Sequence, residues 1–121
     1  MNFVVATYTN AWAETTPYMD ENRPLESMVK AYSLVILNNN LNHRLRLMER
    51  LVKEYHVDGL VIHSARSCKP YSVGQYDLKR LLMERLGGPS VVIEGDITDS
   101  RAYSEEQANT RLEAFFEAME N

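Results

Sequence analysis

The sequence predicts a three-layer α/β/α sandwich with a small, mainly parallel sheet. Short apolar runs alternate along the 121-residue chain with amphipathic stretches of helical period. Strands that alternate with helices pair in parallel and are covered by helices on both faces. The length fits a single domain over residues 1–121, without an internal repeat, low-complexity segment or linker.

The expected strands are short runs rich in β-branched residues. The first is Phe3 to Ala6, which leads into Tyr8. The second is Leu60 to Ile62, a continuous apolar run typical of a strand buried on both faces. The third is Ser90 to Glu94.

Two helices are expected between the first and second strands. Pro24 suits the first turn of a helix, which ends near the run of asparagines at 38–40. A second helix follows, and its outer face, which includes Arg44, is expected to be solvated. The residues expected to face the core are Leu25, Met28, Val29, Tyr32, Val35 and Ile36 in the first helix, and Leu41, Leu45, Met48, Leu51, Val52 and Tyr55 in the second.

Two further helices follow the second and third strands. One begins near Gly74 and is stopped by Gly87 and the glycine and proline after it, which supply a left-handed cap and a breaker. The other begins with a capping box formed by Ser104 and Gln107. The residues expected to face the core are Leu78, Leu81, Leu82 and Leu86, then Ala108, Leu112, Phe115, Phe116 and Met119.

Three polar loops share the carboxyl edge of this sheet, where open α/β sheets bind their ligands. They are Thr9 to Glu21, Ser64 to Val73, and Gly95 to Tyr103. Any site in the domain should be built from these loops. Trp12, in the first loop, is expected to fill an edge of the core.

Composition excludes several classes of function. The net charge of −4 is spread without a basic stripe, so we expect no nucleic-acid partner and no anionic membrane partner. No apolar run approaches the roughly 20 residues of a membrane span, and no secretory signal is visible. A single cysteine allows no intrachain disulfide, and a reducing cytoplasmic compartment is the default expectation.

Cys68 is the most informative residue, since it follows the second strand at the functional edge. Arg66 and Lys69 flank it and would favour the thiolate, the form that binds metals and attacks electrophiles. The alternative is a small buried hydrophobic residue, the commonest role of a free cysteine. Spacing leaves both interpretations open.

Other chemistries receive weaker support. His63 with Cys68 could form a nucleophilic pair, but spacing identifies no third orienting group. Zinc is disfavoured because a structural site needs four cysteine or histidine ligands. Glu94 and Asp96 could act as an acid and a base, yet carboxylates after strands commonly cap loops. The glycines match neither a phosphate-binding loop nor a dinucleotide fingerprint.

The string from His63 to Ser72, continued by Gly74 to Asp77, resembles the last cysteine motif of the 2-hydroxyacyl-CoA dehydratase and benzoyl-CoA reductase family. Further strings also resemble the carboxyl-terminal part of those subunits. They lie at residues 22–27, 50–54, 93–96, 99–107 and 110–115.

This resemblance implies α/β domains of the Rossmann or flavodoxin type and a [4Fe-4S] cluster held by three cysteines, of which Cys68 matches the last. It implies an ATP-dependent activator protein as electron donor, and acyl-CoA substrates that are dehydrated or reduced at an aromatic ring. No residue is assigned a catalytic role, and the sequence does not choose between the two reactions. The neighbours expected around the cluster are Ser64, Arg66, Ser67 and Lys69.

Two departures from the family pattern qualify this expectation. The chain lacks the region that carries the other two cysteines, and Ala65 stands where the family motif has asparagine. We therefore expect the carboxyl-terminal, cluster-binding domain of a larger subunit, without a cluster or activity when isolated. Its partners would be the remainder of the subunit or a partner subunit. The alternative is a non-enzymatic module or remnant that binds a partner subunit or a CoA-like ligand.

Overall fold

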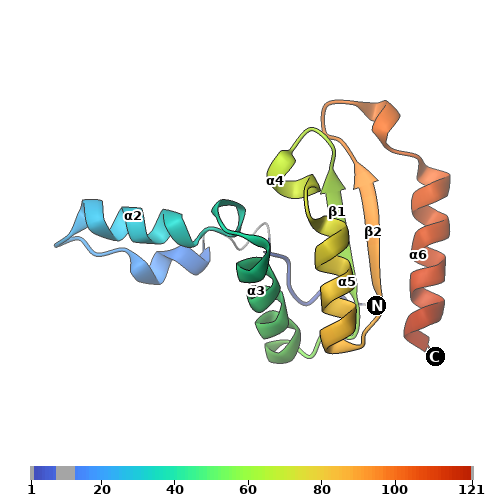
Figure 1. The fold of residues 1–121 in the computed structure, drawn as a ribbon, viewed down its shortest axis with the longest axis horizontal. Coiled ribbons are helices and arrows are strands. Elements are labelled where there is room, and N and C mark those ends of the chain that lie inside the picture. The colour runs from blue at the N-terminus through green and yellow to red at the C-terminus, as the bar shows by residue number, and fades with distance from the viewer. Residues whose placement is uncertain (1, 8–12, 121) are drawn as a thin grey trace.

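The computed structural model describes residues 2–7 and 13–120, which form a mixed α/β structure (Figure 1). A parallel pair of strands lies between helices, and a helical arm extends from it. In chain order the elements are the 3₁₀ helix η1 (Ala13–Tyr18), α2 (Pro24–Leu34), the 3₁₀ helix η2 (Ile36–Asn38), α3 (Leu41–Glu54), β1 (Leu60–Ala65), α4 (Lys69–Ser72), α5 (Gln75–Leu86), β2 (Ser90–Gly95), the 3₁₀ helix η3 (Ser100–Ala102) and α6 (Glu105–Glu120).

The sheet consists of β1 and β2, which run parallel in a register that pairs Leu60 with Ser90 and Ala65 with Gly95. Helix α5 joins the two strands and contacts both, while α3 packs against α5. Helix α6 lies along β2, so α5 and α6 flank the strand pair in Figure 1. The predicted α/β class and parallel pairing are confirmed.

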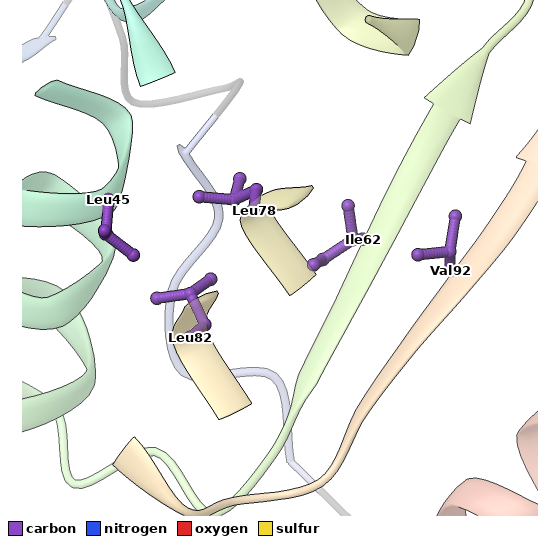
Figure 2. Packing of buried hydrophobic residues seen from close by; sticks show 5 residues of the cluster. All are labelled: Leu45, Ile62, Leu78, Leu82 and Val92. Carbon is purple, nitrogen blue, oxygen red and sulfur yellow. The ribbon is translucent and has the colours of Figure 1, made fainter. Parts of the chain in front are cut away.

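The core lies between α3, α5 and the sheet. Leu45 from α3 and Leu82 from α5 are each 1% exposed, and Leu78, Ile62 and Val92 complete the cluster. Figure 2 shows Leu45 extending from α3 toward Leu78 and Leu82 of α5, and Ile62 extending from β1 toward the same helix. Burial of apolar side chains of this size is the main stabilising contribution to such a fold. The predicted inward faces of α3 and α5 are confirmed at these positions.

The prediction of a strand at Phe3 to Ala6 is wrong. These residues have no regular secondary structure, and the side chains of Phe3 and Val4 are 85% and 52% exposed. A β-branched run favours a strand only where a neighbouring strand completes its hydrogen bonds and packs its side chains. Within the described ranges only β1 and β2 pair. Tyr8 and Trp12, for which roles were predicted, lie outside the described residues.

Helix α2 begins at Pro24 as predicted but ends at Leu34, before the predicted end near residues 38–40. Val35 and Ile36, just beyond it, are buried as predicted, whereas the rest of the predicted apolar face is exposed. Leu25 and Val29 are 77% and 71% exposed, and the residues of α2 that are buried are Ser27 and Ala31. The reason is position: α2 and η1 lie against each other and project from the body of the molecule (Figure 1). An apolar stripe predicts that a face is suited to burial, and here no described part of the chain covers it.

The helix ends largely follow the predicted signals. Gly74 and Gly87 bound α5, and both adopt the left-handed conformation, with φ of 83° and 74°. At the start of α6 the Ser104 hydroxyl oxygen accepts the backbone N–H of Gln107 at 3.3 Å. The carboxylate that pairs with this hydroxyl belongs to Glu106 at 3.0 Å, whereas the capping box predicted Gln107 as the partner.

Strand β1 also differs from its prediction, because it is buried on one face only. Ile62 is buried against α5, whereas Val61, on the other face, is 42% exposed. The partners of these residues in β2 are Val91 and Val92, which lie on opposite faces of the strand and are both buried. Because α6 packs along β2, the outer face of β1 receives less cover.

Candidate functional site

Cys68 lies where β1 gives way to α4, at the carboxyl edge of the sheet, as predicted. Its backbone N–H donates to the carbonyl of Ala65 at 3.0 Å, and its carbonyl accepts the N–H of Tyr71 at 2.9 Å. Two successive turns therefore set the direction of the chain at this residue. The free thiol is half-buried, so Cys68 is neither a fully enclosed core residue nor fully open to solvent.

Helix α3 holds this turn from one side. The Arg44 guanidinium donates through Nη1 to the carbonyl of Pro70 at 2.6 Å, across 26 positions of sequence. A solvated face was predicted for Arg44, and the structure instead gives it a tertiary contact to α4. The pattern of charged and apolar residues in the sequence does not predict such a contact, because the contact depends on how α3 and α4 are placed in space.

The loop after β2 holds the turn from the other side. Asp96 Oδ2 accepts the backbone N–H of Ser67 at 2.6 Å, and Asp96 Oδ1 accepts from Thr98, from its N–H at 2.8 Å and its hydroxyl at 2.7 Å. The hydrogen bonds from Thr98, followed by that from Ser67, hold the pKa of Asp96 well below its ordinary value. A carboxylate that stays ionised and accepts several hydrogen bonds suits the loop-capping alternative better than a proton-transfer role.

Gln75, the first residue of α5, connects the same turn to β1. It is 5% exposed, and its Nε2 donates to the carbonyls of His63 and Tyr71, both at 3.1 Å. A buried amide that pairs with two backbone carbonyls fixes the distance between β1 and α4. In the sequence Gln75 stood out only as one letter of the family-like string, since a single polar residue at a helix start gives no other signal.

A second network lies beside the first and centres on Glu94 of β2. Its Oε2 is 3.0 Å from Nη2 of Arg66, and its Oε1 accepts the Tyr76 hydroxyl at 2.8 Å. The hydrogen bond from Tyr76, followed by that from Arg66, lowers the pKa of Glu94, and the same contact with Glu94 raises the pKa of Tyr76. Arg66, expected beside the thiol, thus extends its guanidinium toward β2.

The remaining predicted neighbours of Cys68 occupy distinct environments. Ser64 is buried within β1, Ser67 contributes its backbone N–H to Asp96, and Lys69 is the exposed first residue of α4. His63 is exposed, and its ring lies near Gly95, where an added Cβ would come within 3.3 Å of Nε2. The structure therefore brings Ser67 and Asp96 together and directs Arg66 to Glu94.

The residues at this edge can supply one ligand of an iron–sulfur cluster. They cannot supply all the ligands that a cluster requires. Clusters of this kind are held by several cysteine thiolates, and this chain has one cysteine. Within residues 2–7 and 13–120, no three side chains of cysteine, histidine, aspartate or glutamate converge on a point where a metal ion could sit. Further ligands would have to come from another polypeptide segment.

Residues 1–119 match the family described as 2-hydroxyglutaryl-CoA dehydratase, D-component. The chain belongs to this family. The resemblance noted at the motif around Cys68 is thereby confirmed over almost the full sequence. In the part of the chain that the structure describes, this member of the dehydratase D-component family contains no helix long and apolar enough to cross a membrane.

Curated relatives of this D-component family member are subunits of multi-subunit enzymes by name. It is 37% identical to a benzoyl-CoA reductase subunit of Thauera aromatica over 84% of the chain and 23% of the relative. It is 34% identical to the alpha subunit of lactoyl-CoA dehydratase of Anaerotignum propionicum, over 85% of the chain and 24% of the relative. It is 33% identical to the (R)-2-hydroxyisocaproyl-CoA dehydratase alpha subunit of Clostridioides difficile, over 99% of the chain and 28% of the relative. The chain thus spans about a quarter of the length of these relatives.

Proposed function

We propose that this chain is the carboxyl-terminal domain of a 2-hydroxyacyl-CoA dehydratase or benzoyl-CoA reductase subunit, and that Cys68 is one cysteine ligand of a [4Fe-4S] cluster in the complete assembly. Such a cluster supplies low-potential, single-electron chemistry, here directed at acyl-CoA thioesters. The electrons would come from an ATP-dependent activator protein in the cytoplasm. The isolated chain is inactive in this proposal.

The observation that carries the proposal is the way the turn around Cys68 is held. Arg44 from α3, Asp96 from the loop after β2, and Gln75 from α5 each bond to the backbone of the segment next to the thiol. Hydrogen bonds around a metal ligand orient it toward the metal and hold it in the geometry that binding requires. A cysteine that served only to fill space would not require tethers from three separate elements.

The exposed face of α2 supports docking of the domain onto another polypeptide. Leu25, Met28, Val29 and Tyr32 present apolar side chains on an arm that projects from the body (Figure 1). Exposed apolar patches of this kind mark interaction surfaces. The matched relatives are about four times as long as the region they share with this chain, so the remainder of such a subunit, or a partner subunit, is the proposed occupant.

The same face also favours the second candidate, a non-enzymatic module that only binds a partner subunit or a CoA-like ligand. The two candidates differ in what they require of Cys68. The enzyme subunit needs the thiolate for iron, whereas the module needs the α2 face and would tolerate loss of the thiol.

The test is co-expression of the chain with the polypeptide encoded next to it, followed by anaerobic purification and iron quantitation. The enzyme proposal expects a complex whose iron is lost with Cys68→Ser and kept with Ser72→Ala, a matched control on α4. Iron that persists in the Cys68→Ser complex would refute the ligand role. A stable complex without iron, disrupted by Val29→Asp, would favour the module.

The isolated chain provides a second measurement. After anaerobic reconstitution with iron and sulfide it should hold no stoichiometric iron, because one thiolate cannot supply the cysteine ligands that a cluster requires. Stoichiometric iron that disappears in Cys68→Ser would show instead that the short chain holds a cluster by itself, through contacts between copies.

A further inference from the structure

A polar cavity of about 190 Å³ lies between β2, η3 and the first turns of α6, and Arg66 of the turn that carries Cys68 also lines it. Ile93 and Glu94 line it from β2, and Gln107 lines it from α6. Three guanidinium groups, those of Arg66, Arg101 and Arg111, also line it. They come from three different segments of the chain, after β1, in η3 and in α6.

The charge of this cavity is opposite to that of the whole chain. Its lining carries three arginines against one carboxylate, that of Glu94, in a protein of net charge −4. Two carboxylates lie beside the lining, since Asp99 pairs with Arg101 through two contacts of 2.9 Å and Glu106 accepts the Ser104 hydroxyl at 3.0 Å, so the excess of positive charge belongs to the lining itself. A concave surface lined by one sign of charge concentrates ligands of the other sign.

The arginines are held in place by the protein. Arg111 donates through Nη1 to the backbone carbonyl of Val92 at 2.9 Å, which fixes its guanidinium against β2. Both oxygens of Glu94 are engaged, one by Arg66 and the other by Tyr76. The two aspartate contacts orient Arg101. Planar guanidinium groups held in fixed orientations suit bidentate hydrogen bonds to phosphate oxygens.

The size of the cavity restricts what enters it. Pockets for drug-sized ligands measure roughly 300–1,000 Å³, and this cavity of about 190 Å³ is smaller. It accommodates one small polar group and leaves the rest of any larger molecule outside. Its apolar lining from Ile93 and Ala108 is minor beside the arginines, so a neutral apolar ligand is disfavoured.

We propose that the cavity lined by Arg66, Arg101 and Arg111 is a binding site for a phosphate or diphosphate group. The group would lie between the guanidiniums of Arg66 and Arg111 and accept a hydrogen bond from the Gln107 amide. The start of α6 contributes little, because the Ser104 hydroxyl already caps the Gln107 N–H. The site does not depend on Cys68 or on iron, so its failure and that of the proposed function are separable.

The experiment is a titration of the ¹⁵N-labelled chain with inorganic phosphate, pyrophosphate and ADP at constant ionic strength, followed by amide chemical shifts. Saturable shifts are expected in β2, η3 and the first turns of α6. Arg66→Gln and Arg111→Gln should each weaken binding about 10- to 100-fold, the loss expected for a hydrogen bond between charged groups. Arg80→Gln on α5 removes the same charge outside the cavity and should leave binding unchanged, as should Cys68→Ser.

Each outcome decides the proposal. Tighter binding of ADP than of pyrophosphate would identify a phosphate group carried by a larger molecule, and equal binding a free anion. Shifts that do not saturate, or that arise elsewhere, would overturn the site. So would an equal loss of affinity in Arg80→Gln and Arg111→Gln. Because Arg111 also bonds to the backbone of β2, Arg66, whose side chain is 60% exposed, decides the result if Arg111→Gln does not fold.

Discussion

Asp96 Oδ2 lies 2.6 Å from the backbone nitrogen of Ser67, so the segment after β2 holds the segment after β1 one residue before the thiol. This contact spans 29 positions of sequence and joins the two loops that the parallel strands bring to one edge. The position of the thiol therefore depends on the tertiary fold as well as on its local turn.

Replacement of Asp96 by asparagine should loosen this junction. The amide side chain keeps one acceptor oxygen where the carboxylate has two, so it cannot serve Ser67 and Thr98 equally. Hydrogen exchange at the Ser67 amide is expected to accelerate, while Asp77→Asn on α5 should leave it unchanged. Unaltered exchange at Ser67 in Asp96→Asn would contradict the assigned role.

Asp96 also predicts how stability changes at acid pH. Its folded pKa lies below the unfolded value of about 3.9, so its contribution to the free energy of unfolding is present above that value and is lost as pH falls through the folded pKa. Urea titrations at neutral and strongly acid pH measure the free energy of unfolding. The decrease between the two pH values should be smaller in Asp96→Asn than in the parent chain. An identical loss would show that Asp96 is not linked to unfolding.

The pairing of Tyr76 with Glu94 predicts an effect in the alkaline range. The carboxylate raises the pKa of Tyr76 because it accepts a hydrogen bond from the protonated phenol, so this contact stabilises the fold below about pH 10 and is lost as pH rises through the folded value. Glu94→Gln should lower the pKa of Tyr76 toward its ordinary value. The readout is the tyrosinate absorbance difference between each protein and its Tyr76→Phe counterpart, and an unchanged midpoint would refute the coupling.

Core and arm leucines should respond differently to truncation. Leu82→Ala is expected to lower the free energy of unfolding by about 2–5 kcal/mol, because Leu82 is 1% exposed and its removal leaves a cavity. Leu25→Ala on α2 should change it by no more than about 0.5 kcal/mol. Urea unfolding measures both. Equal losses would mean that α2 packs against the body of the molecule.

Gly59 provides a test of how closely α6 approaches the start of β1. A Cβ at this position would lie 2.7 Å from Cζ of Phe115 and 3.1 Å from the sulfur of Met119. Gly59→Ala should therefore cost about 1–3 kcal/mol through overpacking. Phe115→Leu should relieve part of this cost, which a double-mutant cycle would reveal as a coupling between the two positions. Additive effects would indicate that the ring moves aside freely.

The sequence predicted those elements whose signals are local. Helix boundaries at Pro24, Gly74 and Gly87 follow from backbone preferences of single residues, and the parallel pair follows from alternation of strands and helices. The placement of Cys68 at the carboxyl edge follows from that topology. These features require no knowledge of which surfaces meet.

The features that escaped prediction depend on which surfaces meet. Phe3 to Ala6 and the apolar face of α2 have the composition of buried segments, but burial requires a covering partner that the described chain does not supply. Arg44 and Gln75 act through hydrogen bonds to distant backbone carbonyls, and side-chain type alone does not reveal such bonds. The arginines of the cavity are likewise scattered in sequence and gathered only by the fold.

The pairing of only two strands within the described residues has a consequence for folding cooperativity. A pair of strands this short is at best marginally stable in water and persists here because α5 and α6 pack against it. Detachment of either helix would remove the support of the sheet, so the two strands and these helices should open as one unit in hydrogen exchange. The α2 arm, with little of its surface buried, would open independently and at lower free energy.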